Sequence, residues 1–411
     1  MPNLFSPMYM PFRKVCKGLC ALLLTLSQPL LAQQQLSPGA RISLLTCSPG
    51  TELYTTFGHS AIRIQDTARR IDLIYNYGLF DFDTPNFYWK FLRGKLSYKL
   101  GVQSFASFLA EYREEQRTVV EQEIRFRPEE RQKLYDFLQE NYRPENRYYL
   151  YDFFYDNCAT RIRDALENEA TERLRYQYPE APKASFRQML DKYLLGRPWI
   201  DFGIDLVLGQ PADRVADFRE QMFLPDYLAQ NLQLAFIDNH LPLLGPPQRL
   251  TWYTPTEAKA TGITPVSLFW LLFGLLGILS VLVHHRFLLQ IDLMLFGLSG
   301  LLGCLLLFMW WGTDHPATAW NYNLLWANPL LLPLTYYYGR GRRRGALLWG
   351  SVVSLIWAGL LVAWMALPQQ LHPACIPLVL MMLIRLLSLL LENWAPPQPP
   401  GEAFAEAEPP R

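Results

Sequence analysis

The sequence predicts two parts, an α+β domain outside the cytoplasm followed by an α-helical membrane domain of about five spans. Three observations predict this arrangement. A short apolar stretch near the start is typical of an export signal. Alternating and helix-like runs, rich in Tyr, Phe and Arg, fill residues 33–262. Long apolar runs then dominate residues 263–394, and a chain of 411 residues has room for both parts.

Residues 1–32 are predicted to be a signal peptide. The apolar core "LCALLLTLSQPLLA" follows a basic region made of Arg13, Lys14 and Lys17. Leu30-Leu31-Ala32 fits a cleavage site. An uncleaved signal anchor is the alternative, but the apolar stretch is short and interrupted by Pro29. We expect cleavage, which leaves residues 33–262 in the periplasm.

Five apolar segments are predicted to cross the membrane, because about 20 apolar residues form a helix of sufficient length. They are residues 265–283, 287–310, 323–338, 346–367 and 374–391. Asp292 and Arg385 lie within two of these segments. Charges are costly in lipid, so we expect Arg385 to be paired or to reach the interface.

The loops between the segments give an independent test of orientation. "HHR" at 284–286 and "GRGRRRG" at 339–345 carry the arginines, and basic loops stay in the cytoplasm. The loops "WGTDHPATAWNYN" and "PQQLHPA" then lie in the periplasm with residues 33–262. The chain is therefore predicted to be a multi-pass membrane protein with residues 33–262 outside the cytoplasm, and the family resemblance described below implies the bacterial inner membrane. Its Pro-rich tail, residues 395–411, is predicted to be disordered in the cytoplasm.

Residues 33–262 begin with strand patterns and continue with helix patterns. The predicted strands are "ARISLLTCSPG", "SAIRIQD", "RIDLIYNYG" and "FLRGKLSYKLGVQ". The predicted helices are "SFASFLAEYREEQ", "RPEERQKLYDFLQENY" and "CATRIRDALENEA". The stretch from residue 170 to 262 gives few such signals.

Cys158 is the first candidate for chemistry. Asp156 and Asn157 are good N-cap residues, so the cysteine is expected in the first turn of a helix. Free N–H groups and the helix dipole favour negative charge there, and thiols at helix starts become thiolates near neutral pH. Neighbouring backbone amides can also stabilise an oxyanion.

A cysteine nucleophile needs a base, and His59 in "FGHSAIRI" is the best candidate. It begins a predicted strand after Gly58, which permits close approach of other groups. Asn76 lies on the next strand and could orient the imidazole. Papain-like enzymes usually have the order Cys, His, polar residue. The order here therefore predicts a permuted papain-like arrangement, with strands first and the nucleophile helix last.

Non-catalytic interpretations also fit these residues. A lone cysteine is often buried and inert, and a histidine in a strand is often structural. After signal removal, residues 33–262 hold only Cys47 and Cys158, which could form a disulfide in an oxidising compartment. Alternatively, Cys47 could line the same pocket as Cys158.

Three separated motifs carry a family resemblance: "LLTCSPGTELYTTFGHSAIRI", "IYNYGLFDF" and "YDNCATRIRD". Over about residues 40–200 they resemble a bacterial family with an NlpC/P60-like domain of permuted papain type. With the membrane spans and the loop "TDHPATAWNYNLLWANPL", the chain resembles the lipoprotein N-acyltransferase of Bacteroidota, which is distinct from the nitrilase-fold enzyme. The resemblance implies that Cys158 is the nucleophile and His59 its base, with Asn76 as third member.

The resemblance also implies a reaction and its partners. Cys158 would take an acyl chain from a phospholipid as a thioester and pass it to the amine of a diacylglyceryl lipoprotein. His59 would move the protons. Contact with these substrates is expected from polar residues on the same side of the membrane, namely Cys47, Asp314, His315, Asn321 and Asn323. "LGRPWIDFGIDLVLGQPAD" is read as a loop that shapes a lipid entry, or as packing.

Other classes of function are excluded or kept as alternatives. A net charge of +1 gives no reason to expect nucleic acid. No HExxH or paired-cysteine motif occurs, so neither a metal nor a cofactor is expected. One alternative is a cysteine peptidase or amidase that acts on cell-wall peptides with water as acceptor. The other is a non-catalytic membrane-tethered module with a structural Cys158.

Overall fold

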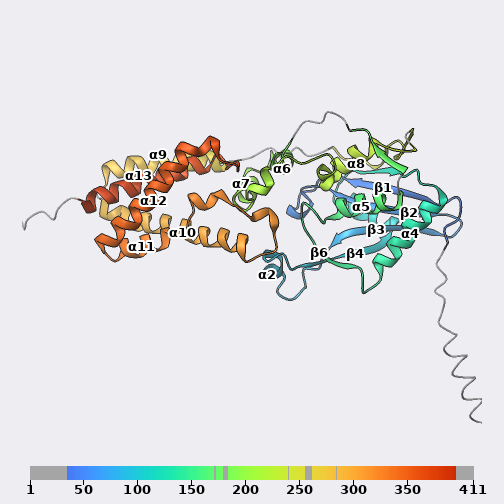
Figure 1. Ribbon diagram of the computed structural model, residues 1–411, viewed down its shortest axis with the longest axis horizontal. Helices are drawn as coiled ribbons and strands as arrows, with labels where there is room; N and C mark the ends of the chain where they lie inside the picture. Colours follow the sequence, from blue (N-terminus) through green and yellow to red (C-terminus); the bar gives the residue numbers. More distant parts are fainter. Residues whose placement is uncertain are drawn as a thin grey trace, which may run out of the picture.

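The computed structural model describes residues 35–170, 173–178, 184–238, 240–254, 262–283 and 285–394. The predicted signal peptide and the predicted tail lie outside these residues. Figure 1 shows an elongated molecule, with a sheet-rich domain at one end and a bundle of helices at the other. The chain therefore has the predicted order of an α+β domain followed by a helical domain.

A seven-stranded antiparallel sheet forms the centre of the first domain, in the order β10-β5-β1-β2-β3-β4-β6. The strands are β1 Arg41–Cys47, β2 His59–Asp66, β3 Ile71–Leu79, β4 Ser97–Ser104, β5 Val119–Glu123, β6 Tyr148–Leu150 and β10 Gln248–Thr251. The four predicted strands are β1 to β4. The fourth begins later than predicted, because Phe91 and Leu92 end a short helix, α2 (Phe87–Leu92).

Both faces of this sheet are covered. Helices α4 (Pro128–Tyr142), α5 (Cys158–Ala170) and α8 (Pro225–Gln233) pack on one face, where Ile62 of β2 shares a core with Ile162 of α5. Helix α3 (Phe105–Glu114) contributes Phe108 to a second core with Ala61 of β2. Neighbouring residues of one strand thus enter different cores, as the two-residue period of a strand requires.

The three predicted helices of this domain are present as α3, α4 and α5, and each begins at a capping signal. Ser104 accepts a hydrogen bond from the N–H of Ser107 before α3. Pro128 is the first residue of α4, where its missing N–H costs nothing. Asn157 precedes α5, as predicted.

The described residues between 173 and 254 add elements for which the sequence gave little signal. They include α6 (Phe186–Leu194), α7 (Pro198–Val207) and a small sheet of β7 (Leu174–Tyr176), β8 (Ala235–Ile237) and β9 (Leu241–Pro242). The interpretation of residues 195–213 as a loop is wrong, because Pro198 starts α7 there. Phe202 of α7 belongs to the core of the membrane domain, which favours the alternative reading of this segment as packing.

The membrane domain contains α9 (Pro265–Leu282), α10 (His285–Trp311), α11 (Leu331–Gly339), α12 (Arg343–Ala363) and α13 (Cys375–Trp394). Among the described residues, three helices are long and apolar enough to cross a membrane, and α13 has a shorter apolar part at Cys375–Leu391. The predicted third span is not one continuous helix. Helix α11 rises only about 14 Å, well short of a hydrocarbon core of about 30 Å. The number of spans stays a prediction.

A buried ion pair joins three of these helices. The guanidinium of Arg385 in α13 donates to both carboxylate oxygens of Asp292 in α10, at 2.8 and 2.7 Å. It also donates to the hydroxyl of Ser280 in α9, at 2.8 Å. Asp292 is fully buried, so the expectation that Arg385 is paired is confirmed.

Removal of one partner should therefore cost more than removal of both. We expect Asp292→Leu to destabilise the folded protein by about 3–5 kcal/mol, because it leaves a buried cation without a counter-charge. The double variant with Arg385→Leu should recover much of that loss. Thermal unfolding followed by tryptophan fluorescence in detergent gives the comparison, and equal losses in both variants would contradict this account.

Candidate active site

Cys158 is the first residue of α5, and the residue before it fixes the local backbone. The side-chain oxygen of Asn157 accepts hydrogen bonds from the N–H groups of Ala159 and Thr160, at 2.8 and 2.9 Å. Its amide nitrogen donates to the carbonyls of Phe153 and Phe223. This cap satisfies two of the free N–H groups at the helix start and leaves that of Cys158 itself.

His59 reaches the thiol from the sheet. It is the first residue of β2, pairs in register with Cys47 of β1, and follows Gly58. Gly58 has φ of +78°, and a Cβ atom there would lie 2.8 Å from the carbonyl oxygen of Cys47. Only glycine allows the chain to turn so tightly into β2, which brings His59 beneath the start of α5.

Asn76 of β3 orients the imidazole, as predicted. Its side-chain oxygen forms a hydrogen bond with Nε2 of His59. An amide oxygen only accepts, so Nε2 carries the proton in this arrangement. Nδ1 is then the nitrogen that remains for the thiol of Cys158, and a hydrogen bond joins the two side chains. The three predicted catalytic residues are therefore assembled at one place.

The electrostatics of the pair favour charge separation. Burial alone would raise the pKa of Cys158, but His59 and the backbone N–H groups of Ser60 and Ala159 hold it below its ordinary value. Burial would likewise lower the pKa of His59, but the Cys158 thiolate and the bonds from Cys158 and Asn76 raise it. The site thus supports a thiolate beside an imidazolium, the reactive form of a cysteine nucleophile.

Cys47 lies in the same region but differs in character. It is fully buried, and burial raises the pKa of its thiol to about 12. Cys47 and Cys158 are both free thiols in this structure, so the disulfide alternative is not observed. Cys47 packs in the core that contains Ala61 and Phe108, and its predicted contact with substrate stays a prediction.

The sequence interpretation missed Tyr149 of β6. A methyl group on Gly78 would lie 3.7 Å from Cβ of Cys158 and 4.0 Å from the hydroxyl of Tyr149, so the three groups border one space. Among the described residues, this hydroxyl is one of the few buried side-chain atoms without a hydrogen-bond partner. Burial and then the nearby Cys158 raise its pKa, so it keeps its proton and can donate. Strand β6 has only three residues, Tyr-Tyr-Leu, and lies at the edge of the sheet, so the sequence gave no signal for this role.

A cavity of about 230 Å³ adjoins the site from another side. It is lined by residues of β3, among them Asn76, by residues of β4, and by Tyr142 of α4. Cys158 and His59 do not line it. The cavity therefore borders the orienting amide rather than the nucleophile.

Asp314 and His315 contact the periplasmic domain rather than the thiol. The carboxylate of Asp314 forms an ion pair with Lys95, and its N–H donates to the carbonyl of Arg93 at 3.0 Å. Nε2 of His315 lies 3.0 Å from the carbonyl oxygen of Phe91. Both residues thus hold the end of α2 against the loop after α10.

Asn321 and Asn323 bind the end of α7. The amide nitrogen of Asn321 donates to the carbonyl of Leu206 at 2.8 Å, and that of Asn323 donates to the carbonyl of Asp205 at 3.0 Å. Carbonyls at a helix C-terminus lack partners within the helix, so these amides complete α7. The structure gives all four polar residues of this loop a role in joining the domains, and their predicted contact with substrate stays a prediction.

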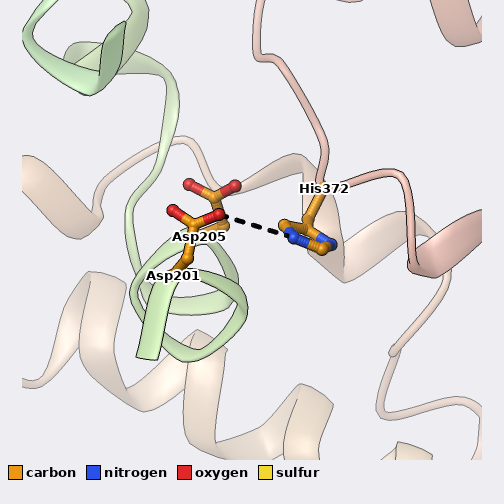
Figure 2. A group of neighbouring side chains, drawn as sticks. All are labelled: Asp201, Asp205 and His372. Atoms are coloured by element: carbon orange, nitrogen blue, oxygen red, sulfur yellow. Dashed lines mark ion pairs between the residues drawn. The ribbon is translucent and has the colours of Figure 1, made fainter. Parts of the chain in front are cut away.

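A second polar cluster lies at the same junction (Figure 2). Asp201 and Asp205 of α7 face His372 from the loop before α13, and their ligand atoms lie within 4.8 Å of one another. Such a donor set could hold a metal ion, but Arg187 already forms an ion pair with Asp205. Nε2 of His372 lies 3.7 Å from Asp201. The cluster brings α7 next to the loop before α13, and no sequence motif predicted it.

A sheet domain joined to apolar helices long enough to cross a membrane defines a membrane-anchored protein, and the thiol–imidazole pair makes its periplasmic domain a candidate for cysteine chemistry. Residues 31–192 match the Lnb N-terminal periplasmic domain, and residues 256–394 match the Lnb transmembrane domain. The chain belongs to the Lnb family.

These matches confirm the resemblance to the lipoprotein N-acyltransferase of Bacteroidota. The protein lies in the inner membrane with a periplasmic domain, and its role is in the processing of lipoproteins. No curated protein and no solved structure matches the chain. The papain-like topology therefore stays a prediction.

The thiol pair can be tested without any substrate. We expect the alkylation rate of Cys158 by iodoacetamide to rise with pH through a pKa below the ordinary value of 9.0. His59→Ala should move that inflection to higher pH, because the cation that favours the thiolate is lost. Peptide mapping separates Cys158 from Cys47, which should stay unlabelled. An unchanged inflection in His59→Ala would disprove the pairing.

Proposed function

We propose that the protein is a lipoprotein N-acyltransferase that works through a thioester on Cys158. The acyl donor would be a phospholipid, and the acceptor would be the N-terminal amine of a diacylated lipoprotein. The observation that carries the proposal is the Cys158–His59–Asn76 arrangement in a domain docked on membrane helices. A nucleophile held at a membrane is suited to substrates that are both lipids.

The first half-reaction would form the thioester. The Cys158 thiolate attacks the ester carbonyl of the phospholipid and forms a carbon–sulfur bond. The tetrahedral intermediate then collapses, the ester carbon–oxygen bond breaks, and the lysophospholipid leaves. The proton for the leaving oxygen comes from Nδ1 of His59, whose other nitrogen is held by Asn76.

The second half-reaction would return the enzyme to its starting state. Nδ1 of His59, now neutral, takes a proton from the lipoprotein amine as the amine attacks the thioester carbonyl. An amide bond forms, the carbon–sulfur bond breaks, and the sulfur leaves as a thiolate. The imidazolium and thiolate are thereby restored, so no further reactant is needed.

Both steps place negative charge on the carbonyl oxygen, which requires donors. The N–H of Cys158 lies at the helix start and is left free by the Asn157 cap. The hydroxyl of Tyr149 is buried, protonated and without a partner beside the thiol. We assign these two groups as the donors of the oxyanion site.

The covalent step has a direct test. We expect brief incubation with phospholipid to add one acyl mass to the wild-type protein and none to Cys158→Ala. Cys158→Ala should keep its unfolding temperature within a few degrees, because it removes one sulfur atom. Intact-mass spectrometry reads the adduct, and a diacylated lipopeptide should then discharge it. Retained activity in Cys158→Ala would overturn the mechanism, whereas discharge to water alone would favour a hydrolase.

The oxyanion assignment predicts a different pattern for Tyr149→Phe. We expect the rate of Cys158 acylation to fall by about 10²–10³, the usual cost of one oxyanion donor. Alkylation of Cys158 by iodoacetamide should be unchanged, because that reaction has no oxyanion. Tyr148→Phe, on the neighbouring exposed ring, is the matched control. An equal loss in alkylation and acylation would mean that Tyr149 only supports the fold.

A further inference from the structure

A series of aromatic side chains connects the thiol with the membrane domain. We name as the aromatic path the residues Tyr151, Tyr98, Phe80, Phe82, Phe87 and Trp89. At the inner end, a methyl group on Gly78 would lie 3.6 Å from the Tyr151 ring and 3.7 Å from Cβ of Cys158. Tyr151 stacks on Tyr98, with ring centroids 4.4 Å apart. The path therefore begins at the nucleophile.

The rings continue from there toward α2 without a break. Phe80 lies 5.3 Å from Tyr98, and Phe82 lies 4.9 Å from both Phe80 and Phe87, between centroids. These contacts link the start of β4 to the loop after β3 and to the first residue of α2. The rings from Tyr151 to Phe87 thus form an unbroken series of contacts, and Trp89 follows Phe87 two residues along α2.

The outer end of the path meets a membrane helix. Trp89 of α2 stacks on Phe308 of α10, with centroids 5.7 Å apart and the rings nearly parallel. In Figure 1, α2 lies beside the end of α10, between the bundle and strands β4 and β6. The contacts of Asp314 and His315 with the segment after α2 hold it in this position. Helix α2 therefore carries both the Phe87 end of the ring series and the contact of Trp89 with the periplasmic end of α10.

Two rings of the path are unusually exposed, while its other four are half-buried. Phe82 is 59% exposed and Trp89 is 53% exposed, while Tyr88 beside them is 80% exposed. Large contiguous apolar surfaces on a soluble face mark interaction sites. Aromatic residues are also enriched where a membrane meets water. The surface is fitted to a lipid at the bilayer boundary.

We infer that the aromatic path seats the acyl chain of the phospholipid donor and brings its ester carbonyl from the bilayer to Cys158. This inference rests on the proposed function. The donor chain is the occupant, because its first carbon must reach the sulfur while the rest of it stays apolar. Ring contacts run from Phe87 to Tyr151, and helix α2 carries Trp89 from the Phe87 end of that series to Phe308. The acceptor, in contrast, presents a polar amine to the thioester.

The test compares two acyl donors on the full-length protein in nanodiscs. The long-chain donor is palmitoyl-oleoyl phosphatidylethanolamine, and the short one is p-nitrophenyl butyrate, which is too short to use the path. We expect the variant Phe82→Ser with Phe87→Ser to lose about tenfold or more in the rate of Cys158 acylation by the phospholipid. Acylation by the butyrate ester should stay within about twofold of wild type.

The outcomes separate the inference from the proposed function. Tyr178→Ser removes a 71% exposed ring outside the path and should leave both rates unchanged. Equal rates for wild type and the double variant with phospholipid would overturn the inference alone. So would a parallel loss with both donors, which indicates general damage. A wild-type protein that neither donor acylates would overturn the proposed function as well.

A second measurement identifies the molecule that binds along the aromatic path and does not require catalysis. Cys158→Ala in nanodiscs is illuminated with a phosphatidylethanolamine that carries a diazirine on one acyl chain, and the labelled peptides are mapped by mass spectrometry. We expect labels on the segments that hold Phe80 to Tyr98 and Tyr151. The double variant should reduce them. Labels confined to the membrane helices would contradict the inference.

Discussion

The hydrogen-bonded pair of Cys158 and His59 is the interaction on which the rest of the site depends. A thiolate is costly in a buried position, and its charge persists only because an imidazolium lies beside it. The neighbouring groups fix that geometry: Asn157 sets the start of α5, Gly58 sets the entry of β2, and Asn76 holds the far ring nitrogen. Much of the sheet can be understood as the frame that aligns these residues.

At the junction between the domains, buried polar and charged groups are likewise stabilised by partners placed beside them. The C-terminal carbonyls of α7 are satisfied by Asn321 and Asn323 from the membrane domain. Arg187 binds Asp205 and Asp213 beneath them, and the peptide N–H of Gln370 donates to Asp213. Burial and the neighbouring carboxylates of Asp205 and Asp201 raise the pKa of Asp191 to about 7, because a further negative charge is unfavourable there. Arg187 supplies positive charge to this group of acids.

Local signals in the sequence predicted the part of the fold that carries the chemistry. Strand alternation located β1 to β3, and the Asn157 cap placed Cys158 in a first helical turn. What escaped prediction depends on contacts between distant segments. Tyr149 becomes notable only when β6 joins the edge of β4, and nothing local marks that pairing. Asp201 and His372 likewise meet across 171 residues of chain.

The membrane domain shows a different limit of sequence patterns. Hydropathy counts apolar residues, but it does not register where the backbone leaves the helix. In the predicted third span, Asn328 accepts from the N–H of Leu330, and regular helix begins only at Leu331. Irregular backbone of this kind is tolerated near lipid only where other parts of the protein cover it. Helix α7 covers the segment that precedes Leu331 at Asn321 and Asn323, whose amides bond to its carbonyls.

The cross-domain bonds of α7 also set a mechanical condition. Several hydrogen bonds join α7 to the membrane domain, so the height of the thiol above the membrane helices is restricted, and in the proposed reaction the lipid rises to meet it. Each methylene withdrawn from the bilayer costs about 0.8 kcal/mol unless another apolar surface receives it. A thicker bilayer brings the headgroups closer to the thiol and a thinner one takes them away. In the proposed reaction, bilayer thickness thereby becomes a variable of the rate, set by the host membrane rather than by the active site.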